Sequence, residues 1–178
     1  VFTLDEQGMD WVGILKQLFV TNKNKISDIL FKDKYYMRSL LKGVVREPNF
    51  VSFTEDNYDQ IKMVDGLVKP RRSDSARGIY HFSGKIDYGK LKNAIGYVGD
   101  DEYIAEEYIH YDKMFSVDGY TDLNGHERFF AHEYDRKISD FRTNPYMTVY
   151  TNHLYYTDKN KLKELFNLSR KVIKTLST

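Results

Sequence analysis

The C-terminal segment carries the pattern that most restricts how this chain can fold. After Asp158, apolar side chains recur at helical spacing and lysines recur among the positions between them. This spacing predicts a long amphipathic helix with one apolar face. Such a helix gains most of its stability by packing that face against another layer, so the chain must supply a partner surface. The apolar set is Leu162, Leu165, Phe166, Val172, Ile173 and Leu176.

Short segments typical of strands supply that partner surface. Residues 44–53 read as a strand or hairpin interrupted at Pro48, because proline cannot donate to a ladder. Residues 78–86 alternate in the strand manner, and residues 146–156 form the strongest predicted strand. The dipeptide Asn124-Gly125 predicts a hairpin turn. We therefore expect a mixed, mostly antiparallel sheet with the C-terminal helix packed on it.

Two helices are predicted before this sheet. A capping box at Thr3 and Glu6 starts the first, which ends near Thr21. Apolar spacing from Ile26 to Leu41 predicts the second, which Gly43 closes. A short loop joins them, so we expect an antiparallel pair.

The predicted fold class is thus α+β, with an N-terminal helical pair, a mixed and mostly antiparallel sheet, and a long C-terminal amphipathic helix. A chain of 178 residues fits a single domain, 1–178. A possible subdivision separates the helical pair, 1–43, from an α+β core, 44–178.

A further helix is predicted over residues 100–115. Acidic residues at its start suit the helix dipole, and apolar residues recur at helical spacing. On such a helix Glu102 and Glu106 share a face opposite the apolar stripe, so we expect both in water rather than in a metal or hydrolase site. Shorter helices are expected after Thr54 and Asp87. The stripe consists of Ile104, Tyr108, Tyr111 and Phe115.

Charge and cysteine content exclude several classes of function. The 27 basic and 26 acidic residues give a net charge of +1, which argues against broad coating of nucleic acid. The absence of cysteine excludes disulfides, thiolate nucleophiles and Cys-ligated zinc. The apolar runs are too short to predict a transmembrane helix. We expect a cytoplasmic protein that does not contact a membrane.

The histidines do not predict a metal or acid/base centre. His126 and His132 are six positions apart, which leaves them on different faces of a helix or roughly 20 Å apart on a strand. His81-Phe82-Ser83 matches one half of a two-histidine phosphoesterase pattern, but no second half follows. The glycine-rich nucleotide-binding motifs are absent as well. We therefore expect no cofactor, no metal and no catalytic residues, and lean against an enzyme.

A basic loop at residues 69–77 is the best candidate for a binding site. Its cations precede a strand that can present aromatic rings, and arginine forks suit phosphate or carboxylate partners. A plain solvated connection is the alternative reading of the same composition. The predicted binding set is Lys69, Arg71, Arg72, Arg77, Tyr80 and Phe82.

The aromatic content directs the functional prediction. Fifteen Tyr and 11 Phe suit recognition surfaces, although Tyr also fills strands. We predict a non-enzymatic binding protein, a small bacterial or bacteriophage regulatory or inhibitory factor whose partner is a protein of the transcription or replication machinery. The alternatives are a nucleic-acid-binding protein that uses loop 69–77, and a metal-dependent nuclease or phosphoesterase. Nothing in the sequence fixes the oligomeric state.

Overall fold

The computed structural model describes residues 32–73, 78–95, 103–121, 124, 126–134, 149–150 and 153–176. Two compact units make up the chain: unit 1 is Val1–Ile109 with Lys174–Thr178, and unit 2 is His110–Ile173. The helix predicted to end near Thr21 lies outside the described residues, as does the start of the second helix. Whether the chain behaves as one folding domain stays a prediction.

The described part of unit 1 begins with helix α3 (Lys34–Leu41). Asp33 caps this helix, because its Oδ1 accepts from the backbone N–H groups of Tyr35 and Tyr36 at 3.0 and 3.2 Å. Gly43 follows the helix with a φ of 79°, a conformation that glycine adopts without strain. The C-terminal part of the predicted second helix is thus confirmed.

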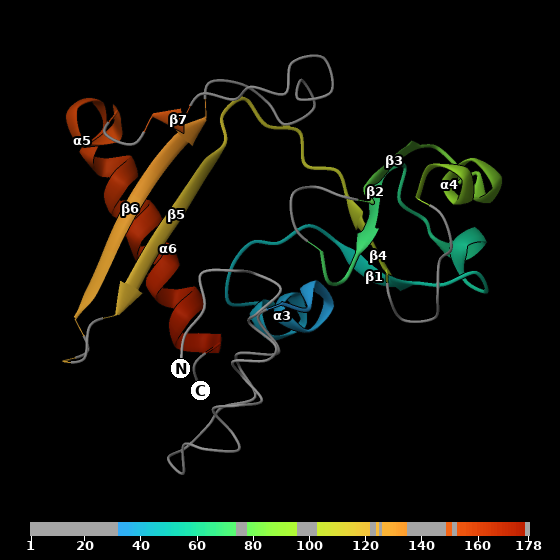
Figure 1. The fold of residues 1–178 in the computed structure, drawn as a ribbon, viewed down its shortest axis with the longest axis horizontal. Helices are drawn as coiled ribbons and strands as arrows, with labels where there is room; N and C mark the ends of the chain where they lie inside the picture. The colour runs from blue at the N-terminus through green and yellow to red at the C-terminus, as the bar shows by residue number, and fades with distance from the viewer. Residues whose placement is uncertain are drawn as a thin grey trace, which may run out of the picture. The chain divides into compact units, whose positions relative to one another are not determined.

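Unit 1 contains a four-stranded antiparallel sheet, sheet 1 (Figure 1). Its strands are β1 (Phe50–Phe53), β2 (Asp65–Pro70), β3 (Tyr80–Ser83) and β4 (Tyr103–Glu107). They lie in the order β1-β4-β2-β3, so the strand that comes last in the chain occupies an inner position.

The prediction of a helix over residues 100–115 is wrong. Residues 103–107 form β4, and β5 (Phe115–Thr121) follows in unit 2. Tyr103, Ile104, Ala105 and Glu106 are all buried, because β4 pairs on both sides and both of its faces are covered. A strand of this kind lacks the apolar–polar alternation that would reveal it. The helix expected after Thr54 is likewise reduced to the 3₁₀ turn η1 (Tyr58–Gln60).

One face of sheet 1 builds the core of unit 1. Helix α4 (Tyr88–Ile95) supplies Leu91 to this core and confirms the short helix predicted after Asp87. Partly buried aromatic and aliphatic side chains from the segments between strands pack around it. The buried cluster is Phe53, Val68, Phe82, Ile86, Leu91, Tyr103 and Ala105.

Unit 2 contains a second antiparallel sheet, sheet 2, in the order β5-β6-β7. Strands β5 and β6 (Glu127–Tyr134) pair as a hairpin, as the Asn124-Gly125 turn predicts. Strand β7 is only Val149–Tyr150, and α5 (His153–Thr157) begins within the predicted strand 146–156. That prediction is therefore only partly right.

The long C-terminal helix is α6 (Lys159–Leu176), and Asp158 caps it by accepting from the backbone N–H of Lys161 at 2.8 Å. Within unit 2 it packs on the β5–β6 hairpin (Figure 1): the rings of Phe129 and Phe166 lie 5.5 Å apart. The α+β class with a C-terminal helix on a sheet is confirmed. Across the described residues, the structure has no helix with both the length and the apolar character needed to cross a membrane.

Candidate functional site

A pair of opposite charges lies on the face of sheet 1 that is turned away from the core. Val68 and Ala105 point into the core, so their neighbours Lys69 and Glu106 project from the other face. The ammonium of Lys69 donates to Oε1 of Glu106. Glu106 is only 5% exposed, so this carboxylate is held almost out of water.

Helix α3 and the segment that follows it extend this pair into a chain of four charges. Nη2 of Arg38 lies 2.7 Å from Oε2 of Glu106, and Nη1 of Arg38 lies 3.6 Å from Oε1 of Glu47. Positive and negative groups alternate along the series Lys69, Glu106, Arg38, Glu47, which we name the charged cluster. All four side chains are largely buried.

Burial also changes the acidity of two members of the charged cluster. Desolvation lowers the pKa of Lys69 below its ordinary value, although Glu106 acts in the opposite direction; Arg38 adds to the lowering. Desolvation raises the pKa of Glu47, which Glu106 reinforces and Arg38 opposes. Keeping these charged groups out of water costs desolvation free energy, and a ligand of complementary charge can offset part of that cost.

Arg71, another predicted binding residue, is committed to the protein itself. Its Nε and Nη2 donate to the carboxylate of Asp33 at 3.0 and 2.8 Å, and its guanidinium lies over the rings of Tyr35 and Tyr36. The side chain of Lys34 also reaches this segment and donates to the carbonyl of Ser73 at 3.0 Å. These contacts fasten the end of β2 to the start of α3.

The other predicted cations differ in their surroundings. Arg72 is half exposed, and its Nε lies 3.8 Å from Oδ2 of Asp33. Arg77 lies outside the described residues. Lys69 belongs to β2 rather than to a loop, so the segment between β2 and β3 begins only after Pro70.

The predicted aromatic members lie on the core side of sheet 1. Phe82 is 4% exposed and belongs to the buried cluster, and Tyr80 packs against that cluster. The structure thus does not gather the five described members of the predicted set on one surface. It brings Lys69 together with Glu106, which sequence analysis assigned to a solvated helix face, and with Arg38 and Glu47, which sequence analysis did not single out.

A histidine and a tyrosine mark the other end of the same face. His81 on β3 lies directly opposite Leu67, and its Nε2 is 2.7 Å from Oδ1 of Asp65. The rings of His81 and Tyr108 lie 4.8 Å apart. His81, Asp65 and Tyr108 thus form a polar and aromatic rim at this end of the face.

The histidines of the segment around β6 are not brought together as metal ligands. His132 lies on β6 with its Nε2 2.8 Å from Oδ2 of Asp118 on the neighbouring strand. His126 precedes β6. Among the described residues, no group of three or more His, Cys, Asp or Glu side chains is arranged to hold a metal ion.

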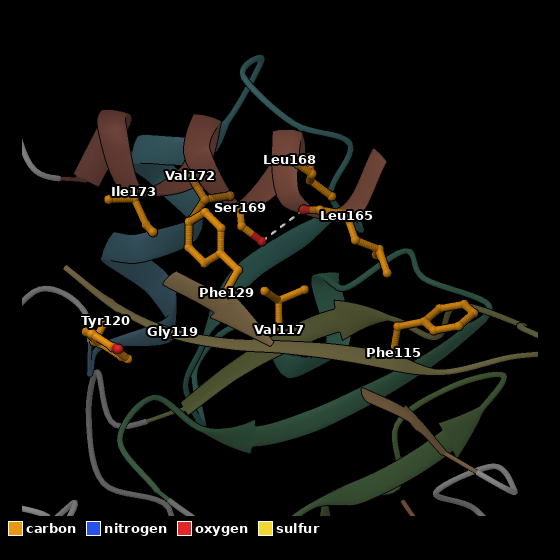
Figure 2. A pocket seen from close by; sticks show the side chains of 10 residues that line it. All are labelled: Phe115, Val117, Gly119, Tyr120, Phe129, Leu165, Leu168, Ser169, Val172 and Ile173. Carbon is orange, nitrogen blue, oxygen red and sulfur yellow. Dashed lines mark hydrogen bonds between the residues drawn. The ribbon is translucent and has the colours of Figure 1, made fainter. Parts of the chain in front are cut away.

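Unit 2 contains an apolar groove of about 580 Å³ between β5–β6 and α6 (Figure 2). Val117 and Phe129 face it from the sheet, and Leu165 and Val172 face it from the helix. Ser169 is the main polar side chain, and its hydroxyl donates to the backbone carbonyl of Leu165 at 2.9 Å. The groove offers contact area but no charged group for chemistry, unlike the charged cluster.

No model of a known protein family matches the sequence, and no curated protein matches it. Solved structures do resemble it. A D-Ala:D-Ser ligase from Enterococcus faecalis matches 96% of this chain with a TM-score of 0.69 and 18% identity, over 53% of its own length. An L-amino acid ligase from Bacillus licheniformis matches 99% of this chain with a TM-score of 0.69 and 14% identity, over 41% of its length.

A carboxyaminoimidazole ribonucleotide synthase from Aspergillus clavatus, solved in complex with ATP, gives a TM-score of 0.63 at 12% identity. The match covers 84% of this chain and 39% of the synthase. The chain therefore spans about half or less of the length of these three structures. At such low identity the likeness establishes the fold alone, which is that of a part of these three structures.

This likeness corrects the functional prediction. A non-enzymatic regulatory or inhibitory factor of bacteriophage type was expected, with a nucleic-acid-binding protein or a metal-dependent nuclease as alternatives. The structural neighbours are ligases, which are enzymes, and they contradict that prediction. The physical reason for the error lies in β4: treating residues 100–115 as a helix separated Lys69 from Glu106 and left no constellation of functional groups.

Proposed function

We propose that this chain is the nucleotide-binding part of an ATP-dependent ligase. The observation that carries the proposal is the likeness to ligases over nearly the whole chain, together with the likeness to a synthase solved with ATP. The charged cluster supports it, because it provides a cation on the face of sheet 1 that is turned away from the core.

Lys69 binds the phosphates in this proposal. An ammonium is a compact positive charge that suits phosphate oxygens, and Glu106 accepts only one of its three N–H donors. Pro70 ends β2, and the segment between β2 and β3 contains glycine, serine and arginine. A segment of this composition can turn backbone N–H groups toward an anion.

The base of the nucleotide lies at the other end of the strand face. Asp65 and Lys69 are four residues apart on β2, a span of roughly 13 Å at about 3.3 Å per residue. His81 and Tyr108 flank Asp65 at that end and offer aromatic faces on which a purine can stack. An extended nucleotide would thus run from the His81–Tyr108 rim, across Leu67, to Lys69.

The reaction class we infer is the joining of a carboxylate to an amine. Two of the neighbours are amino acid ligases by name. Forming an amide from a free carboxylate in water requires an activated acyl group, and ATP supplies the activating phosphoryl or adenylyl group. The part of the enzyme described here holds and orients the nucleotide for that step.

Titration calorimetry with ATP and Mg²⁺ tests the proposal directly on this chain. We expect saturable binding, and we expect Lys69→Met to weaken it by about tenfold or more, as for loss of a charge-assisted hydrogen bond. Lys90→Met is the matched control, because Lys90 is an exposed lysine that forms an ion pair with Asp87 at the start of α4. Its affinity for ATP should equal that of the wild type.

The proposal fails if the wild-type chain does not bind ATP, or if Lys69→Met and Lys90→Met bind it equally well. Near-ultraviolet circular dichroism of each variant establishes that the fold is intact before affinities are compared.

A further inference from the structure

If Lys69 binds phosphate, Glu106 must change its hydrogen-bond partner. This condition rests on the proposed function. In the structure Glu106 accepts from Lys69 on one oxygen and lies against Arg38 on the other. A phosphate that recruits Lys69 must compete with this buried carboxylate. Once Lys69 turns away, Glu106 loses the partner on Oε1 while it stays buried, and an unpaired buried carboxylate is costly.

Arg38 has the unused donor that this exchange requires. Its Nη2 already lies 2.7 Å from Oε2 of Glu106, while its Nε is buried and has no hydrogen-bond partner. Nε and Nη2 of one guanidinium form a fork that matches the two oxygens of a carboxylate. A small rotation of the Arg38 side chain would offer Nε to the oxygen that Lys69 releases.

We propose that Arg38 is a positioning residue that keeps Glu106 paired while Lys69 moves to the phosphates of the nucleotide. Arg38 does not touch the nucleotide in this scheme. It acts through Glu106, by neutralising a carboxylate that would otherwise hold Lys69 back and repel the incoming phosphate. Glu47, 3.6 Å from the guanidinium on its far side, keeps the cluster balanced in charge.

The other cations near β2 cannot take this role. Arg71 donates to both oxygens of Asp33 and its guanidinium lies over the rings of Tyr35 and Tyr36. Lys34 is fastened to the backbone carbonyl of Ser73. Among the described residues, Arg38 and Lys69 are the cations that form ion pairs with Glu106.

A double-mutant cycle on ATP affinity tests the inference. We expect Arg38→Gln to weaken ATP binding by about tenfold, because Glu106 then competes for Lys69 without compensation. We expect Glu106→Gln to bind ATP at least as well as the wild type. In the Glu106→Gln background, the added Arg38→Gln change should then alter affinity by less than about twofold, since the charge that Arg38 neutralises is gone.

Arg38→Lys provides a second variant in case Arg38→Gln does not fold. Lysine keeps the charge but lacks the fork, so binding should weaken by a few-fold and recover when Glu106→Gln is added. A loss that is equally large with and without the Glu106 carboxylate would overturn the inference, as would unchanged affinity in folded Arg38→Gln. Failure of the wild type to bind ATP would instead reject the proposed function, and that measurement precedes every variant.

Discussion

Arg71 and Asp33 form a two-point ion pair: Nε of the arginine lies 3.0 Å from Oδ1 and Nη2 lies 2.8 Å from Oδ2. The two residues belong to segments far apart in the sequence, the end of β2 and the start of α3. Asp33 also caps α3, so one carboxylate joins a helix start to a strand end. Both side chains are largely buried, so the pair stabilises the packing of α3 on the end of β2 rather than offering a surface to a ligand.

Replacing Asp33 should separate the two roles of this carboxylate. Asp33→Asn keeps a capping oxygen but leaves Arg71 as a buried cation with a neutral partner, and we expect a loss of about 3 kcal/mol in the free energy of unfolding. Asp33→Ala also removes the cap and should cost about 1 kcal/mol more. Urea unfolding measures both. Asp87→Asn is the control, because Asp87 caps α4 in the same way at an exposed position and its variant should barely move the midpoint. Equal midpoints for the Asp33→Asn and Asp87→Asn variants would contradict the importance of the ion pair.

Gly66 should tolerate no side chain. A Cβ there would lie 2.5 Å from Cζ of Phe82 and 2.8 Å from the backbone oxygen of Glu106. We expect Gly66→Ala to lower the free energy of unfolding by about 1 to 3 kcal/mol through overpacking. At Gly89, on α4, an added Cβ would lie 3.4 Å from Oδ1 of Asp87, an ordinary contact, so Gly89→Ala should instead be stabilising by roughly 0.4 to 1 kcal/mol. Thermal or urea unfolding of the two variants decides, and a shift of the same sign in both would contradict the packing seen beneath β2.

Glu47 should make stability depend on pH in a defined direction. Burial raises its pKa above the ordinary 4.5, so the folded state retains the proton to higher pH than the unfolded chain. The stability contributed by this group is complete below the unfolded value and is lost as pH rises through the raised folded value. Glu47→Gln does not titrate, so it should gain stability relative to the wild type from acidic to neutral pH. Urea unfolding at a series of pH values tests this, with Glu164→Gln as a control for the loss of one exposed carboxylate. A difference that stays constant, or falls with pH, would contradict the expected sign.

Tyr58 and Tyr88 should be energetically coupled. Their rings are stacked with centroids 5.0 Å apart, between η1 and α4, and both pack against the core of unit 1. A double-mutant cycle with leucine at each position should give a coupling of about 0.5 to 1.5 kcal/mol in the free energy of unfolding. Strictly additive effects would mean that the rings contribute only by the area they bury.

The parts of the fold that the sequence predicted well are those with local signals. Helix α6 combines a capping aspartate with a long apolar stripe, and the sequence between β5 and β6 contains the dipeptide Asn124-Gly125, which is typical of hairpin turns. Asp87 and α4 follow the same logic. In each case the information lies within a few residues of the element that it specifies.

Strand β4 failed as a prediction because its determinants are not local. It is an inner strand with four consecutive buried residues, so the periodicity that marks a half-exposed strand is missing. The apolar residues at helical spacing in this region belong to two different strands and the segment between them. A signal was present in the short run YIAEE after the acidic residues, but only its pairing partners make that run a strand.

The same limit applies to the candidate site. Lys69 could be selected from its basic neighbourhood, whereas Arg38 and Glu47 have nothing in their own surroundings that marks them. Their roles depend on the packing of α3 over sheet 1, where the rings of Tyr35 and Phe50 also meet. Conversely Tyr80 and Phe82 alternate as a presenting strand would, yet the face they share is the core.

The inner position of β4 has a consequence for biosynthesis. β1 and β2 do not pair with each other. Each pairs with β4, and the partner of Phe50 in the ladder is Glu106. A ribosome that has released only the first three strands has therefore exposed Phe53 and Val68 to water with no means of closing the sheet over them. We expect the nascent chain to be exposed to aggregation and proteolysis during this time. The exposure ends when residues 103–107 emerge and pair with both β1 and β2.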